Sequence, residues 1–378
     1  MPNPTLGQTL SRAPSSGRPR LDYLDGLRAL AALYVVLHHA FLQSWPYLAD
    51  PKIKPGAIGE TLFVWLRCGQ FAVTVFIAIS GFCLMLPVLR AKQLQGGVKG
   101  FALGRVRRIL PPYYAALAIS LILALCFIRP HSNTRYDVSL PVTHSGVLAH
   151  LLLVQDFHWS VYEINGPMWS IAVEVHIYLL FPLFVWLWKH LGILPVLVLS
   201  GILSLSLSHL VSIGVLRSPA PAYIFVFGLG MAAACFSYGE AERWLPRFSI
   251  SLLATIAVIS FVLGTWLFQS GRGTRSDFMI GISAACFLAI LSRNATGSLR
   301  RRFSAKWLVL IGGFSYSLYL LHFPFQQLFW QWLVLPFHLS RMAGFLIVAG
   351  PGTVVILLLC YLFYRVFERP FMRQKPVV

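Results

Sequence analysis

The chain has 378 residues, of which 57% are hydrophobic and only 11% are charged. This composition excludes an ordinary soluble domain, in which about a quarter of the residues are charged, and is typical of a protein with several membrane-spanning helices. The formal net charge of +19 does not indicate nucleic-acid binding, because the Lys and Arg residues gather in short segments between apolar runs. Loops at the cytoplasmic face of a membrane have this pattern.

Ten apolar runs are long enough, or nearly so, to cross a bilayer as helices of about 20 residues. The runs are 24–44, 69–89, 109–128, 167–188, 192–213, 221–238, 248–268, 277–292, 307–330 and 344–364. The sequence therefore predicts an all-α, polytopic integral membrane protein with about ten transmembrane helices. Because the sixth and eighth runs are short, we expect one of them to be tilted differently or re-entrant.

The distribution of positive charge predicts the orientation. With ten spans both ends of the chain lie on one side, and the segments on that side hold more than twice as many Lys and Arg residues as the others. Both termini are therefore predicted to be cytoplasmic. This interpretation divides the chain into a disordered cytoplasmic tail (1–20), one transmembrane domain (21–370) and a second tail (371–378).

The first apolar run carries the most informative ionisable residues. Arg28 and His39 are eleven residues apart, close to three helical turns, so both side chains are expected on one face. His39 would lie about 16 Å deeper than Arg28, which is about half of the bilayer core. An ionisable side chain at that depth indicates a functional site. The alternative is a histidine that only hydrogen-bonds a neighbouring helix.

A pair of arginines precedes the third run. Arg105 and Arg108 are three residues apart and would point the same way on a helix. Pro111 and Pro112 suit the start of a helix, where no backbone N–H is needed. Guanidinium groups at a helix start suit phosphate binding. Ordinary positive charge at a cytoplasmic loop explains the pair equally well, and for Arg107 it is the preferred explanation.

The fourth run contains an acid within apolar sequence. A carboxylate at the centre of a membrane helix costs about 2.5–3.5 kcal/mol, so Glu174 needs a partner. Trp169, Ser170 and Glu174 fall broadly on one helix face. Glu174 is interpreted as orienting His39, as contacting a hydroxyl-bearing substrate, or as a structural link to Arg28 or another helix.

Other polar positions lie within or beside apolar runs. The Ser80–Gly81 pair of the second run would allow another helix to approach closely. In the ninth run, Tyr316 and His322 either hydrogen-bond neighbouring helices or line a cavity. Near the end of the chain, Glu368 offers a counter-charge at the cytoplasmic surface.

The predicted outer segment 129–166 is rich in polar residues. Its ionisable residues are His131, His144, His150, His158, Asp137, Asp156 and Glu163. Their spacing matches no metal-binding pattern, so no metal is predicted, and a segment facing carbohydrate is the preferred interpretation. The apolar run 146–154 is expected to form a partly buried helix at the membrane interface.

Several short blocks together resemble a known family. They are Leu24-Asp-Gly-Leu-Arg28 with His39, Ile79-Ser-Gly-Phe, Arg105-x-x-Arg108-Ile-x-Pro, Trp169-Ser-x-x-x-Glu174-x-x-x-Tyr178, Ser315-Tyr-Ser-x-Tyr-Leu-x-His322 and Glu368-Arg-Pro. Their order and spread over nearly the whole chain resemble the membrane-bound acyltransferase family 3, the integral-membrane O-acyltransferases of cell-surface sugars. One departure is Val175, where that family often has a second acid.

The resemblance implies a ten-helix transferase in the cell membrane, expected to be a bacterial inner membrane. It would take an acyl group, commonly acetyl, from cytoplasmic acyl-CoA as co-substrate, with no tightly bound cofactor. The acceptor would be a hydroxyl of a surface carbohydrate or glycolipid. His39 would be the essential histidine, Arg28 its companion, and Arg105 with Arg108 part of the donor site. The candidate substrate-binding residues are Trp169, Ser170, Tyr316 and His322.

The chemistry of transfer is compatible with these residues. A thioester is already activated, so the main need is a base for the acceptor hydroxyl, which a neutral imidazole can provide. Arg28 would hold CoA or stabilise developing negative charge, and an acyl-histidine intermediate is an alternative route.

A transporter or flippase is the alternative class, with His39, Glu174 and His322 as a proton or substrate pathway. The arginine pair favours the transferase because a transporter has no need of a CoA phosphate site. The sequence also shows no inverted repeat of the kind found in many transporters.

Overall fold

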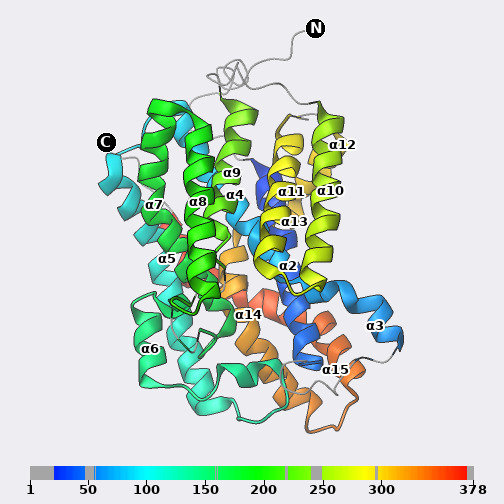
Figure 1. Cartoon of the computed structure of the whole chain (residues 1–378). Helices are drawn as coiled ribbons and strands as arrows, with labels where there is room; N and C mark the ends of the chain where they lie inside the picture. The colour runs from blue at the N-terminus through cyan, green and yellow to red at the C-terminus, as the bar shows by residue number, and fades with distance from the viewer. Residues whose placement is uncertain are drawn as a thin grey trace.

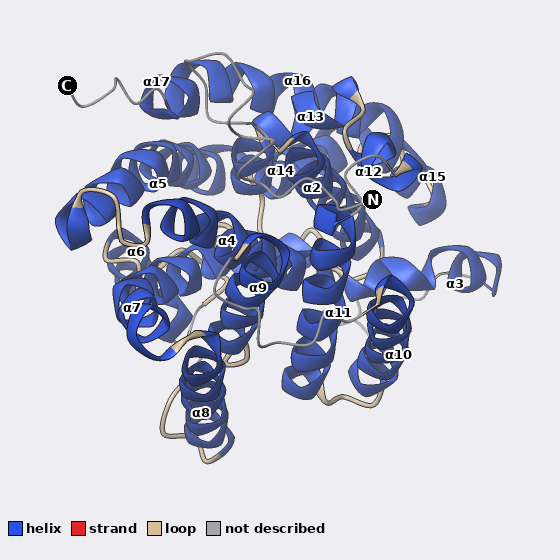
Figure 2. Ribbon diagram, turned by 90° about the horizontal axis from the view of Figure 1, so that it is seen from above, coloured by secondary structure: helices blue, strands red, loops and turns tan. Residues whose placement is uncertain are grey.

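The computed structural model describes residues 21–46, 55, 57–157, 159, 161–217, 220–239, 249–293 and 297–372. Every regular element in these residues is a helix (Figure 1), and Figure 2 shows the helices gathered into one bundle seen from above. The predicted all-α class is therefore confirmed. The predicted tail 1–20 and residues 373–378 lie outside the described residues.

Seven helices of the described part are long and apolar enough to cross a membrane, or eight if one bent pair forms a single span. The seven are α4 (Gln70–Ala91), α5 with its π-helical end (Gly97–Phe127), α7 with a preceding turn (Gly166–Leu191), α8 (Ile193–Ser212), α10 (Ile250–Gln269), α11 (Gly273–Arg293) and the stretch Arg341–Met372. The last stretch comprises α15 (Arg341–Ile347), α16 (Thr353–Phe363) and α17 (Arg369–Met372), joined by π-helical turns. The chain is thus a multi-pass membrane protein.

Two further predicted runs form helices outside this set. The first is α2 (Asp22–Ser44), whose opening turns are polar, and the sixth is α9 (Tyr223–Tyr238), which has only 16 residues. The predicted count of ten spans and the cytoplasmic position of both termini stay predictions.

A break that was not predicted lies in the ninth run, and the different tilt expected of the sixth or the eighth run stays a prediction. The eighth run is part of a complete 21-residue helix, α11, whereas the ninth is broken into α13 (Lys306–Gly313) and α14 (Ser315–Phe329), which meet at 72°. A Cβ atom at Gly312 would lie 1.9 Å from the backbone oxygen of Asp25. The end of α13 therefore touches the backbone of α2, which only glycine permits, and the chain turns there.

Helices α4 and α9 cross in close backbone contact. A Cβ atom at Gly81 would lie 2.2 Å from the backbone oxygen of Phe227, and one at Gly230 would lie 2.1 Å from that of Ala78. The two glycines are reciprocal, since each admits the backbone of the other helix. The prediction that Ser80–Gly81 admits a neighbouring helix is confirmed.

The segment between α5 and α7 lies at one end of the bundle, together with α3 (Ala57–Phe63) and α15 (Figure 1). It contains α6 (His144–Leu151), the helix predicted there, which begins where the Thr143 side chain accepts a hydrogen bond from the Gly146 backbone. No group of three or more His, Cys, Asp or Glu side chains in the described residues could hold a metal ion. His158 lies outside those residues.

Helix α14 is buried among other elements and carries polar side chains at several positions along its length. The Gln326 side chain donates to the carbonyl of Val36 on α2 (2.8 Å). The next residue, Gln327, hydrogen-bonds Gln43 of α2 and the Ser132 hydroxyl. Because a buried amide is stable only with partners, these bonds fix the position of α14 against α2.

Candidate active site

Two histidines from distant parts of the chain meet between α2 and α14. Nε2 of His322 lies 3.1 Å from Nδ1 of His39, although 283 positions separate the two residues. His322 is fully buried, whereas His39 is partly exposed. The ring of Phe323 packs edge-on against His39, and the ring of Tyr136 stacks on Phe323. The sequence singled out both histidines but did not predict their contact.

The neighbouring His38 has a separate environment. Its Nδ1 lies 2.6 Å from the carbonyl of Leu66, in the short 3-10 helix η1 (Val64–Cys68). This hydrogen bond attaches η1 to α2. No role in chemistry is predicted for His38, and its contacts are those of a structural residue.

Glu174 lies in a second polar cluster, which is separate from the histidine pair and includes Ser80, Tyr178 and Arg105. Its carboxylate accepts hydrogen bonds from the Ser80 hydroxyl (3.0 Å) and the Tyr178 hydroxyl. The guanidinium carbon of Arg105 lies 6.0 Å from the centre of the Tyr178 ring. Glu174 therefore links α7 to α4, and the residue that contacts His39 is His322 rather than Glu174.

Arg28 also belongs to this second cluster. It donates to Asp25 (3.1 Å) and to the sulfur of Cys83 (3.2 Å), and it interacts electrostatically with Tyr178. The helix α2 that was predicted to carry both Arg28 and His39 is confirmed. The two side chains nevertheless have different neighbours, three turns apart.

The arginine pair lies on a longer helix than predicted. Helix α5 begins at Gly97, so Pro111 and Pro112 lie inside it rather than at its start. The arginines are therefore not beside the free backbone N–H groups of a helix N-terminus, and the prediction of a helix start at the prolines is wrong. Arg105 is partly buried over the rings of Phe101 and Tyr178, whereas Arg108 is exposed.

The candidate substrate-binding residues of α7 and α14 connect helices. The hydroxyl groups of Ser170 and Tyr319 are 2.7 Å apart, and the Trp169 ring lies 6.0 Å from that of Tyr223. The Tyr316 hydroxyl donates to the carbonyl of Ile109 on α5 (3.2 Å). A role for these residues in substrate binding stays a prediction.

Glu368 points into the bundle rather than to the surface. Its side chain is buried and accepts hydrogen bonds from the backbone N–H and the hydroxyl of Ser317. The sequence does not show that Glu368 contacts Ser317, because 51 positions separate the two residues. The predicted surface position is therefore wrong, whereas the carboxylate does act as a counter-charge, because it interacts electrostatically with Arg108. Its bonds to Ser317 also tie the C-terminal helices to α14.

Sequence reasoning missed a cation near the histidines. Arg135, in the short helix η3 (Arg135–Ser139), interacts electrostatically with both His38 and His39. Its Nη1 atom is buried and has no hydrogen-bond partner in the described part of the chain. Burial lowers the pKa of Arg135 from its usual value. The sequence offered no signal, since Arg135 looks like any charge of an outer segment.

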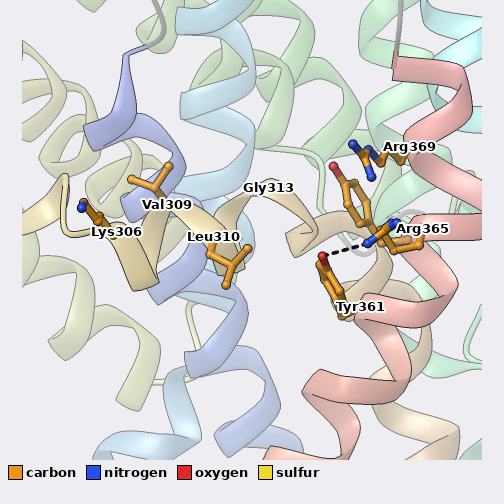
Figure 3. Close-up of a pocket in the computed structure, with 8 residues that line it drawn as sticks. Lys306, Val309, Leu310, Gly313, Tyr361, Arg365 and Arg369 are labelled. Carbon is orange, nitrogen blue, oxygen red and sulfur yellow. Dashed lines mark hydrogen bonds between the residues drawn. The ribbon is translucent and has the colours of Figure 1, made fainter.

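A basic pocket of about 380 Å³ lies between α13 and the C-terminal helices (Figure 3). Its lining includes the cations Lys306, Arg365 and Arg369, and it contains no acid. In Figure 3 the arginines project from one side of the pocket, and Lys306 lies on the other. This charge suits an anionic group, and the pocket is formed by none of the residues that contact His39.

The structure thus defines a multi-pass helical membrane protein in which a partly exposed histidine contacts a buried one between two of its helices. The model of the acyltransferase 3 family, described as an acyltransferase domain, matches residues 21–365. The chain therefore belongs to this acyltransferase family.

Two relatives give the family context. The chain is 24% identical over 354 residues to the peptidoglycan O-acetyltransferase OatA of Listeria monocytogenes, covering 83% of this chain and 51% of that protein. It is 23% identical over 334 residues to the O-acetyltransferase OatA of Staphylococcus aureus, covering 80% of this chain and 50% of the relative. The chain thus spans about half the length of these relatives. No solved structure matches it.

Proposed function

We propose that this chain is a membrane O-acyltransferase, which moves an acyl group, specifically acetyl, from cytoplasmic acyl-CoA to a hydroxyl of a surface carbohydrate or glycolipid. The observation that carries the proposal is His39, a partly exposed histidine inside apolar helices, held on one ring nitrogen by His322. Membership of the acyltransferase 3 family supports it, and so does the acetyltransferase activity named for the relatives. This family favours a transferase over a transporter.

His39 is assigned the role of general base. Nε2 of its ring has no hydrogen-bond partner in the described residues, so it is free to take the proton of an acceptor hydroxyl as the oxygen attacks the thioester carbonyl. The negative charge that develops on the carbonyl oxygen needs a nearby donor or cation. Arg135 has an unpartnered buried Nη1 and is the better candidate than Arg28, whose guanidinium already contacts Asp25 and Cys83.

The donor is assigned to the second polar cluster. Arg105, Arg28, Glu174 and Tyr178 come together on α5, α2 and α7, away from the histidine pair along α2. A guanidinium that is already partly desolvated binds a phosphate group more strongly than an exposed one, because the surrounding dielectric is low. CoA phosphates on Arg105 and Arg108 would leave the thioester free to extend toward His39.

CoA is expected to stabilise the detergent-solubilised wild-type protein against thermal unfolding, and Arg105→Gln is expected to remove most of that stabilisation. A ligand present at 100 times its dissociation constant adds about 2.7 kcal/mol to the free energy of unfolding. The measurement is the melting temperature with and without CoA.

The matched control is Arg107→Gln, which removes an exposed charge from the same helix and should keep the full CoA effect. If Lys306→Gln or Arg365→Gln removes the effect and Arg105→Gln does not, the donor belongs to the basic pocket instead. No stabilisation of the wild type by CoA would contradict the assignment of CoA as the donor. It would favour the transporter alternative, with His39 and Glu174 in a proton or substrate pathway.

A further inference from the structure

We propose that His322 is a positioning residue, which holds His39 in the tautomer whose Nε2 atom carries the free electron pair. His322 would do so by accepting a hydrogen bond from Nδ1–H of His39. The inference rests on the proposed function of His39 as a base, and it adds a residue that acts through His39 without touching the substrate.

The first step concerns the tautomer of His322 itself. Its Nδ1 lies 3.0 Å from the carbonyl oxygen of Leu318 and 2.9 Å from that of Tyr319. A carbonyl oxygen only accepts hydrogen bonds, so Nδ1 must carry a hydrogen. No carboxylate contacts this buried ring in the described part of the chain, and a buried ring without a counter-charge is neutral. Its other nitrogen, Nε2, is therefore an acceptor.

The second step transfers this constraint to His39. Nδ1 of His39 lies 3.0 Å from the carbonyl oxygen of Val35 and 3.1 Å from Nε2 of His322. Both neighbours are acceptors, so Nδ1 of His39 carries the hydrogen and shares it between them. In the opposite tautomer, Nδ1 of His39 and Nε2 of His322 would both carry an electron pair and would repel each other at 3.1 Å. The hydrogen would then be on Nε2 of His39. Nε2 is then unprotonated, as a general base requires.

The carbonyl groups of α14 thus determine the chemistry of a residue on α2. Their hydrogen bonds fix His322, and His322 fixes His39, in the way that an outer partner orients a functional histidine in metal sites. Val35 favours the same tautomer, so loss of His322 should weaken the site rather than abolish it. We expect a fall in acyl transfer of about 10- to 100-fold, the range typical of a lost orienting partner.

The test compares two substitutions of His322 that differ in whether an acceptor remains. His322→Gln keeps an acceptor oxygen that can reach His39, whereas His322→Phe keeps the ring shape without one. The readout is the rate at which diethyl pyrocarbonate modifies His39 in the folded, detergent-solubilised chain, followed by peptide mass spectrometry. The reagent is attacked by an unprotonated ring nitrogen, so its rate reports the Nε2 electron pair and needs neither donor nor acceptor substrate.

We expect His39 in the His322→Phe variant to react about 10-fold more slowly than in the wild type, and the His322→Gln variant to stay within about 2-fold. In acyl transfer the same order should appear in kcat, with KM for acetyl-CoA unchanged. Gln326→Leu is the matched control, because it removes another hydrogen bond from α14 to α2 without contacting His39. It should leave the reactivity of His39 unaltered.

Wild-type reactivity in His322→Phe would overturn the proposal. Equal losses in the Phe and Gln variants would also overturn it, since packing alone would then explain them.

A measurement on the wild type covers the case in which a variant fails to fold. Nitrogen NMR of the ¹⁵N-histidine-labelled protein, with the His39 signals assigned by their loss in His39→Ala, should show a protonated Nδ1 and an unprotonated Nε2. Reversed signals would refute the assignment. If the predicted tautomer and reactivity order appear but the wild type transfers no acyl group, the proposed function fails and the role of His322 stands.

Discussion

Replacing His39 by alanine is expected to abolish acyl transfer while the amount of folded protein in the membrane stays near normal. A positioned general base contributes about 10²- to 10⁴-fold to a rate, and a route through an acylated histidine would lose its nucleophile altogether. The structural cost is small because His39 is partly exposed and leaves only the acceptor nitrogen of His322 without a partner, at about 1–3 kcal/mol. The measurement follows label from acetyl-CoA into surface glycan, using membranes with equal amounts of each protein.

His38→Ala is the matched control. It removes the same kind of side chain from the neighbouring position of α2, where the ring hydrogen-bonds the carbonyl of Leu66 and packs edge-on against His39. Transfer should remain within a few-fold of the wild type. Equal transfer by His39→Ala and the wild type would remove His39 from catalysis, whereas loss of protein abundance would assign it a structural role.

Replacing Gly230 by leucine is expected to remove most of the folded protein. A Cβ atom there would lie 2.1 Å from the backbone oxygen of Ala78, and neither helix backbone can yield without separating α4 from α9. Overpacking by a few atoms in a well-packed core already costs about 1–3 kcal/mol, and a leucine adds a branched side chain at the point of closest contact. The measurement is the yield of monodisperse protein and its melting temperature.

Gly350→Leu is the comparison for that substitution. Gly350 lies in a helical, exposed position at which an added Cβ atom would meet nothing within 4 Å. Yield and melting temperature should stay close to those of the wild type. A wild-type melting temperature for Gly230→Leu would show that the crossing of α4 and α9 is not as tight as described.

The helices could be predicted from sequence because a membrane span is a local property of about 20 consecutive residues. Each of the ten apolar runs coincides with helical structure, although the break at Phe314, between Gly312-Gly313 and Ser315, was not predicted. Helix ends were less predictable, because an apolar run does not show how far a helix extends into polar sequence. Helix α5 illustrates this, since it starts at Gly97, twelve residues before the predicted run.

The candidate site was only partly predictable for a related reason. Depth and polarity singled out His39, Glu174 and His322 one by one, because each is costly within apolar sequence. Which of them are partners depends on how helices far apart in the chain pack, and periodicity carries no such information. The pairing of His39 with His322, and of Glu174 with Ser80, therefore came from the structure.

The polarity of α14 has a consequence for how the protein is made. Gln326 of α14 donates to the backbone of α2, and Gln331, in the π-helical turn η6 (Trp330–Val334) that continues α14, bonds the backbone at Phe127 and Arg129. A newly synthesised α14 alone in lipid would hold these amides without partners, which opposes its insertion. Because α14 is synthesised after α2, we expect the earlier helix to supply these partners as the bundle assembles.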